Sequence, residues 1–407
     1  MAKAKVLISL TLIISLCSWA AESQNDTLPL GSSKFKYELA KIERDQIYET
    51  RSQKVIDISD LVEAFKNTDV FVIGEFHDNY DCHVFQRNFI EALYQRYPKI
   101  VVGFEFFKRE DNRFLEQWRN GEINDGELIE KTGWYKKTAL NYGYTKVVMD
   151  IIKKYRIQTI GLNVSRKILR KVSRKGFNSL SVEEKKLFPT IHIPNAEHRY
   201  LIETIFGNFA TQVPFWFDNI YNAQRCWDVV MAESMREMLE KNEFRGYKGI
   251  IIAGNFHVAY GLGIPFRYKK AQKSVRITTI IPVSLTSEDT NSEDDPHPMK
   301  KMFANQLTQV AVFSRGIGDY VFSASESRFS HFPDLGIKCK KVGEKFQISQ
   351  VKKKSIGEEF GLKKGDFIDS VDGISIKTIE QFRLLSANKK WGDSIKIRVE
   401  KKIDFKK

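Results

Sequence analysis

Five short runs of the chain are almost continuously apolar, and the stretches between them have helical periodicity. The runs are rich in Val, Ile and Phe, which is typical of strands buried on both faces. Alternation of such strands with helices predicts an α/β domain with a mostly parallel sheet flanked by helices. The predicted strands are Val70–Gly74, Ile100–Phe106, Ile157–Leu162, Gly249–Ala253 and Val275–Val283.

The stretch between the first two runs predicts a flanking helix. Apolar residues recur every four positions from Phe85 to Tyr97, which gives a helix one buried face. Asp78 or Asn79 can cap its start, and Pro98 stops it.

The pattern changes after residue 284. Residues 284–298 contain acids, Ser, Thr and Pro with almost no apolar side chains, so they predict an exposed acidic loop. Asp319–Ser327 resembles one more strand of the same domain. We therefore predict an α/β domain over 35–327 and a small β-rich domain over 331–402.

Composition limits the class of protein. A chain of 407 residues with 42% hydrophobic and 29% charged residues is typical of a soluble protein with two or three domains. The formal charge of +14 would suit an anionic partner. Lys and Arg are interleaved with acids and form no arginine-rich helix, so we expect a solvated basic surface and no nucleic-acid partner.

The N-terminus predicts export. Lys3 and Lys5 precede an apolar stretch from Val6 to Trp19, which is typical of a signal peptide over residues 1–20. Two alternatives stay open: lipidation of Cys17, which would anchor the protein to a membrane, and a plain transmembrane anchor.

Three of the predicted strands end in side chains that can bind a metal. Gly74-Glu75-Phe76-His77 and Gly254-Asn255-Phe256-His257 share the pattern Gly-x-x-His, and Glu105 lies inside the second apolar run. Parallel strands bring their carboxyl ends to one sheet edge. His77, Glu105 and His257 thus predict a site for a divalent transition metal.

Other roles for the same residues stay open. Each histidine could cap a strand end through backbone hydrogen bonds, with Glu105 paired to an Arg or Lys. If a metal is bound, Glu75 could act as the general base of a hydrolase. His83 lies on the helix that follows and could project over the same edge.

A set of segments resembles the ChaN group of bacterial haem-binding lipoproteins and, more distantly, the TIKI-type metalloproteases and erythromycin esterases. The resemblance runs from Leu61 to Ser323 and rests on VFVIGEFHDNYDCHVFQRNFIEAL, VVGFEFF, TIGLNVSRKILRKVSRKG, NAQRCWDVVMAESM and IIIAGNFHVAYGLGIP. It implies an exported protein that binds haem for iron uptake, periplasmic or at the outer membrane of a Gram-negative bacterium. In the proteolytic relatives the two Gly-x-x-His motifs and a strand glutamate form the metal site.

No short motif identifies a haem ligand. Residues 192–224 combine His and Tyr with many aromatic residues, a composition that suits a porphyrin. A hydrophobic core or the face of a homodimer explains the same aromatics. The candidate cofactor-binding residues are His83, His198, Tyr200 and Asn255.

The C-terminal segment from Phe332 to Lys401 resembles a PDZ domain. The matching residues include GLKKGD at 361–366, VDG at 371–373 and the loop Leu335-Gly336-Ile337. In that family the backbone N–H groups of the loop hold the terminal carboxylate of a peptide or protein.

Three functions follow from these observations. The first is an exported haem-binding protein with a peptide-binding module. The second is a metal-dependent hydrolase, a peptidase or esterase in which Glu75 activates water. The third is a scaffold that recruits partners through its PDZ domain. We choose the first, with the second as the alternative.

Overall fold

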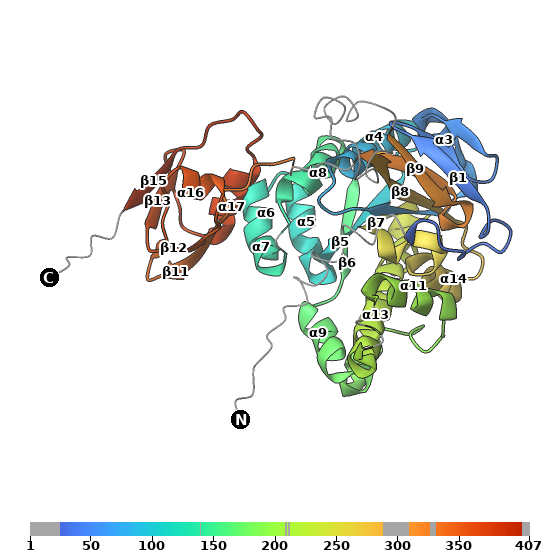
Figure 1. Cartoon of the computed structure of the whole chain (residues 1–407). Coiled ribbons are helices and arrows are strands. Elements are labelled where there is room, and N and C mark those ends of the chain that lie inside the picture. The colour runs from blue at the N-terminus through green and yellow to red at the C-terminus, as the bar shows by residue number, and fades with distance from the viewer. Residues whose placement is uncertain are drawn as a thin grey trace, which may run out of the picture. The chain divides into compact units, whose positions relative to one another are not determined.

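The computed structural model describes residues 25–138, 140–207, 210, 212–287, 309–325 and 331–400. The predicted signal peptide, Cys17 and most of the acidic loop lie outside these residues. Contacts divide the described chain into two units (Figure 1). The first contains residues 25–76, 84–113 and 157–325, and the second contains 77–83, 114–156 and 331–400. The limits 35–327 and 331–402 stay predictions.

A ten-stranded sheet forms the centre of the first unit. Six adjacent strands, in the order β10-β8-β4-β7-β5-β6, are parallel, and the strands joined to them at the sides are antiparallel. The strands are β1 Leu39–Glu43, β2 Ile47–Glu49, β3 Lys54–Ile56, β4 Val70–Glu75, β5 Ile100–Lys108, β6 Gln158–Asn163, β7 Lys248–Gly254, β8 Ile277–Ser287, β9 Gln309–Ser314 and β10 Tyr320–Ser325. The mostly parallel sheet and all six predicted strands are confirmed.

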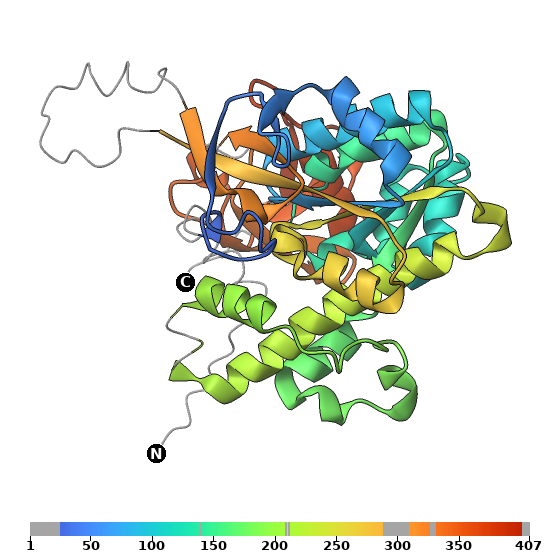
Figure 2. The same ribbon diagram turned by 90° about the vertical axis from the view of Figure 1, so that its right-hand side faces the viewer.

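Helices cover both faces of this sheet (Figure 2). Val70 and Val72 of β4 join a core with Met231 and Met235 of α13, Pro214–Leu239. Phe71, between them, packs edge-on against Phe89 of α4, Tyr80–Arg96, with ring centroids 5.3 Å apart. Burial on both faces explains why the strands are continuously apolar instead of alternating.

The predicted helix is confirmed as α4, and the side chain of Asn79 accepts a hydrogen bond from the Cys82 N–H in its first turn. No helix in the described ranges is long and apolar enough to cross a bilayer. The remaining helices and turns of the first unit are α3 Ile58–Glu63, η1 Ala64–Asn67, η2 Arg109–Asp111, α9 Arg166–Lys175, η3 Phe177–Ser179, α10 Val182–Lys185, α11 Ala196–Phe206, η4 Asn242–Phe244, η5 Asn255–His257, η6 Ala259–Gly261, α14 Ile264–Ala271 and η7 Arg315–Ile317.

One helix corrects the expectation that basic residues are merely scattered. Six of the ten residues of α9, with the sequence RKILRKVSRK, are Arg or Lys, and none is acidic. Leu169, Val172 and Ser173 are buried, and α9 lies beside α13 (Figure 1). The interleaving along the whole chain hid this local concentration of charge.

The second unit joins two distant parts of the chain. Helices α6 to α8 pack against α17 of the C-terminal segment. The bounds are α5 Asn112–Arg119, α6 Asp125–Thr132, α7 Trp134–Lys137, α8 Tyr142–Tyr155, β11 Ile337–Val342, β12 Lys345–Val351, α16 Ile356–Glu359, β13 Phe367–Val371, β14 Ile374–Ser375, α17 Ile379–Ala387 and β15 Ile397–Glu400. The five C-terminal strands form one antiparallel sheet, so the predicted β-rich domain is confirmed.

Specific contacts fix α17 on these helices. Arg383 Nη1 donates to the carbonyl of Tyr135 at 3.1 Å, and Lys136 Nζ lies 3.6 Å from the buried carboxylate of Glu380. Gly143 faces Phe332 so closely that a Cβ there would lie 2.7 Å from its ring. The PDZ-like segment thus packs against helices α6 to α8 through α17 and Phe332.

Candidate functional site

The carboxyl ends of β4, β5 and β7 lie side by side in the first unit, as the sequence predicted. Glu75 and Gly254 are paired in register where β4 and β7 end. Asn255 comes directly after Gly254. If residue 74 had a Cβ atom, that atom would lie only 2.6 Å from Oδ1 of Asn255. Gly74 is therefore required for this close approach.

Glu105 lies within β5, and its side chain reaches the end of β7. Its Oε2 accepts a hydrogen bond of 2.8 Å from the N–H of Gly254, and its Oε1 lies 3.7 Å from Nε2 of His257. The backbone bond fixes one carboxylate oxygen, so the other is directed toward the imidazole.

A second carboxylate holds the other nitrogen of His257. Nδ1 lies 2.6 Å from Oδ1 of Asp228, which is fully buried on α13. A carboxylate this close can accept the Nδ1 proton and orient the ring. Nε2 then faces Glu105, and the side-chain nitrogen of Gln224 lies 2.9 Å from Nδ1 and 3.5 Å from Nε2.

Asp228 also reaches a second imidazole. Its Oδ2 lies 3.5 Å from Nε2 of His198, which is fully buried on α11. His198, Asp228, His257 and Glu105 form a continuous series, which we call the carboxylate–imidazole chain. Burial lowers the pKa of His198 to about 4, against the opposing effect of Asp228. His198 is therefore neutral at neutral pH.

A buried guanidinium lies in the same electrostatic environment. The side chain of Arg267 is inaccessible to solvent, and its Nη1 donates to the carbonyls of Thr190 and Ile193 at 2.8 Å. Burial lowers its pKa, whereas Asp228 raises it. Asp228 is thus a buried negative charge that acts on Arg267 and contacts both imidazoles.

Glu75, the predicted general base, is buried in the first unit. Its Oε2 accepts a hydrogen bond of 2.8 Å from Nε2 of Gln86 on α4. Asn255, a candidate cofactor ligand, is also buried. Both candidates stand at the predicted sheet edge.

His77 and His83 belong to the second unit. His77 is half-buried just after β4, and its carbonyl oxygen lies 3.0 Å from Nε2 of the buried His83. The structure therefore joins Glu105 and His257 in one unit and holds His77 in the other, and the three-ligand site stays a prediction. Among the residues that the structure describes, no three His, Cys, Asp or Glu side chains are grouped to hold a metal.

The Glu105–His257 pair nevertheless fits the chemistry of a metal site. Histidines that bind metals usually donate their second ring N–H to a carboxylate, which orients the ligating nitrogen. Asp228 supplies that carboxylate at 2.6 Å. The same arrangement would let His257 act as a general base without a metal.

A different surface offers aromatic side chains to solvent. Tyr200 on α11 is 47% exposed, and Val213 and Trp216 at the start of α13 are 36% and 64% exposed. Arg199 joins the two helices through an ion pair of 2.8 Å to Asp218. We call α11 and the first turns of α13 the exposed helix pair.

Sequence reasoning missed Asp228. It lies in the segment NAQRCWDVVMAESM, which carried part of the family resemblance, but no role was assigned to it. The available signal was the position of Asp228. It is the one acidic residue from Cys226 to Ala232, and all residues of that run except Trp227 are buried. A charge within a buried helical stripe requires a partner.

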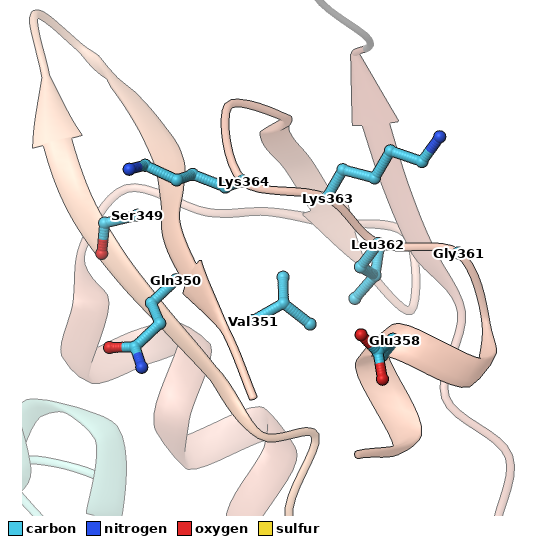
Figure 3. A pocket seen from close by; sticks show the side chains of 8 residues that line it. All are labelled: Ser349, Gln350, Val351, Glu358, Gly361, Leu362, Lys363 and Lys364. Carbon is cyan, nitrogen blue, oxygen red and sulfur yellow. The ribbon is translucent and has the colours of Figure 1, made fainter. Parts of the chain in front are cut away.

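A pocket of about 600 Å³ lies in the PDZ-like segment. Figure 3 shows Val351 and Leu362 at its centre, with the carboxylate of Glu358 below them and Lys364 above. Leu335, Gly336 and Ile337, the predicted peptide-contacting residues, do not line it. The N–H of Gly336 instead donates to the Asp334 carboxylate at 3.0 Å.

Comparisons with known proteins agree with this architecture. Residues 61–267, just over half of the chain, match the family model described as haem-binding uptake, Tiki superfamily, ChaN. Residues 347–390 match the PDZ domain model. No curated protein sequence matches the chain.

Several solved structures are similar at low sequence identity. ChaN of Campylobacter jejuni with cofacial haem is 18% identical, over 68% of this chain and 95% of that chain, with a TM-score of 0.48. The erythromycin esterase EreC is 13% identical over 70% and 98% of the two chains, with a TM-score of 0.40. A Bacillus cereus protein is 14% identical over 67% and 93%, with a TM-score of 0.37.

Proposed function

The chain belongs to the ChaN haem-binding uptake family of the Tiki superfamily, and on that premise we propose that it is an exported protein that binds haem for iron uptake. The observation that carries the proposal is the family match over residues 61–267. The PDZ domain would add a site for a peptide or protein C-terminus.

The exposed helix pair is the surface that suits haem best. A porphyrin is flat and apolar, and a phenol oxygen can bind its iron. Tyr200 is the one exposed member of the four candidate cofactor-binding residues, since His83, His198 and Asn255 are buried. Val213 and Trp216 supply apolar area on the same helix pair, and haem bound there would supply an iron centre.

Export is supported by the sequence alone. Lys3, Lys5 and the apolar stretch from Val6 to Trp19 favour a periplasmic or outer-membrane location. Lipidation of Cys17 is one means of membrane attachment. A globomycin-sensitive shift in mobility of the full chain would support lipidation, and a shift that persists in Cys17→Ala would contradict it.

The PDZ domain supports peptide binding at the edge of β11, which pairs with β12 on its other side. A bound peptide would add as a further strand there, with its terminal carboxylate at Leu335-Gly336-Ile337. The Asp334 carboxylate already accepts from the Gly336 N–H. An incoming carboxylate would compete with it.

Titration with hemin tests the main proposal. We expect a shifted Soret band for the wild-type chain and a changed ligand signature in Tyr200→Phe. Tyr37→Phe is the matched control, because Tyr37 is also on the first unit and is 78% exposed. An unshifted Soret band in the wild type would reject haem binding, and identical spectra in both variants would reject Tyr200 as the ligand.

The alternative, a metal-dependent hydrolase, is favoured by one observation: the carboxylate at 2.6 Å that orients His257 toward Glu105. His257 would bind a divalent transition metal or take a proton from water, and Glu75 would assist as a base. Hydrolysis of activated esters and peptides by the wild type and His257→Gln tests it. Activity that is equal in both, with no bound transition metal, would remove the alternative.

A further inference from the structure

The helix α9 presents a cationic surface that the proposed haem site does not use. Arg166, Lys167, Arg170, Arg174 and Lys175 are exposed. At 3.6 residues per turn, they and Lys171 fall on one half of the helix, opposite the buried Leu169 and Val172. The apolar half is already covered by α13, so only the cationic half is available to a partner.

This charge is poorly compensated within the protein. Among the described residues, only Lys171 of the six basic side chains forms an ion pair, at 2.7 Å from Glu184. Keeping cations next to one another costs free energy unless an anionic partner meets them.

We propose that the cationic face of α9 docks on the surface of an anionic phospholipid bilayer. Clusters of four to eight Lys and Arg on an amphipathic helix are typical of such surfaces. The face carries long cationic side chains and no exposed Ser, Asn or Gln that could read nucleotide bases. The basic and apolar N-terminal stretch of the sequence also directs the chain to a membrane.

The chemistry predicts adsorption without insertion. A helix that inserts needs its apolar face for the lipid, and that face of α9 is occupied. Attraction is therefore electrostatic, between guanidinium or ammonium groups and lipid phosphates, and is screened by salt. The docking does not depend on haem binding.

Sedimentation with vesicles tests the proposal on the full-length chain. The lipids are phosphatidylglycerol mixed with phosphatidylcholine, or phosphatidylcholine alone, at low and at high salt. The neutral vesicles measure any binding through the N-terminal apolar stretch, which all variants share. We compare wild type, Arg170→Gln/Arg174→Gln/Lys175→Gln, and the control Lys352→Gln/Lys353→Gln/Lys363→Gln, whose lysines are exposed on the second unit.

The two triple variants remove the same net charge from different surfaces. At about 1 kcal/mol per cation near an anionic surface, the α9 variant should lose roughly 100-fold in partitioning to anionic vesicles. The control triple variant should change the partitioning to anionic vesicles less than about threefold, because its lysines lie outside the docking face. Far-ultraviolet circular dichroism and a urea midpoint that are the same in wild type and the α9 variant show that the variant is folded.

Three outcomes would overturn the proposal. One is undiminished binding by the α9 variant, and another is an equal loss in both variants, which would mean a dependence on net charge alone. The third is competition by duplex DNA: if DNA releases wild type from anionic vesicles and binds through α9 at the same salt concentration, the partner is a nucleic acid.

Discussion

The two faces of one helix pair have opposite character. On α11, His198 is fully buried and Tyr200, two residues later, is 47% exposed. On α13, Asp228 is fully buried, whereas Trp216, three turns earlier, is 64% exposed. Successive residues of a helix are rotated by 100°, so one helix can direct some side chains to the core and others to solvent. The inner face thus holds the carboxylate–imidazole chain, and the outer face holds aromatics that a large flat ligand could reach.

This difference separates two kinds of chemistry. The inner face has one imidazole oriented by a carboxylate and one neutral imidazole, which suit a small substrate or a metal. The outer face has an accessible phenol and apolar area, which suit a porphyrin. Substitutions on the inner face should therefore change stability, and substitutions on the outer face should change hemin binding.

The largest effect should come from the inner face. Asp228→Ala removes the buried carboxylate that contacts His257 at 2.6 Å and acts on the buried Arg267, which should lower the free energy of unfolding by about 3–5 kcal/mol. Urea denaturation measures it. Asp218→Ala on the same helix removes the ion pair with Arg199, in which the Asp218 side chain is 52% exposed. This change should lower the free energy of unfolding by less than about 1 kcal/mol. Equal losses would mean that Asp228 does not act on the buried cation.

A pH-dependent effect should follow from His198. Its pKa is about 4 in the folded chain and near the ordinary 6.5 when unfolded, so the unfolded state binds more protons between these values. The free energy of unfolding should then fall as pH falls from 6.5 to 4, by about 3 kcal/mol from this residue. The difference between wild type and His198→Gln over that range isolates it. A constant difference would contradict the buried neutral imidazole.

The outer face should affect ligand binding and leave stability unchanged. Trp216→Ala removes exposed apolar area, so hemin affinity should fall roughly tenfold, or about 1.4 kcal/mol. Urea midpoints should stay within error. The control Trp391→Ala removes a tryptophan that is 57% exposed in the second unit. A similar loss of hemin affinity in both variants would remove the exposed helix pair as the haem surface.

The smallest effect concerns the PDZ domain. Asp334→Ala removes the carboxylate that occupies the Gly336 N–H, so affinity for peptides with a free C-terminus should rise roughly threefold, or about 0.6 kcal/mol. Fluorescence anisotropy with free and amidated versions of the same peptides measures it. A gain that is equal for both versions would mean that the loop does not hold the carboxylate.

The sheet and its strand ends could be predicted because continuous runs of Val, Ile and Phe are typical of strands that are buried on both faces. Glu105 and His257 lie at one sheet edge, and their joint coordination with His77 stays a prediction. The partners of His257 could not be predicted in the same way. Asp228 and His198 come from two helices whose contact depends on packing, and no spacing in the sequence encodes that contact.

The cationic helix was missed for a simpler reason. Charge was judged over the whole chain, where acids balance much of it, whereas α9 concentrates six cations in ten residues. A window of helical length would have found it. Burial of the imidazoles, by contrast, needs coordinates.

The contact between α17 and helices α6 to α8 has a consequence for synthesis. Arg383 reaches the carbonyl of Tyr135 across 248 residues of sequence. The helices at 125–155 therefore finish their packing only after almost the entire polypeptide has left the ribosome or the translocation pore. A contact between residues so distant in sequence slows folding, and apolar surface stays exposed to solvent until the contact forms. A chain shortened before residue 331 should consequently depend on chaperones for its yield.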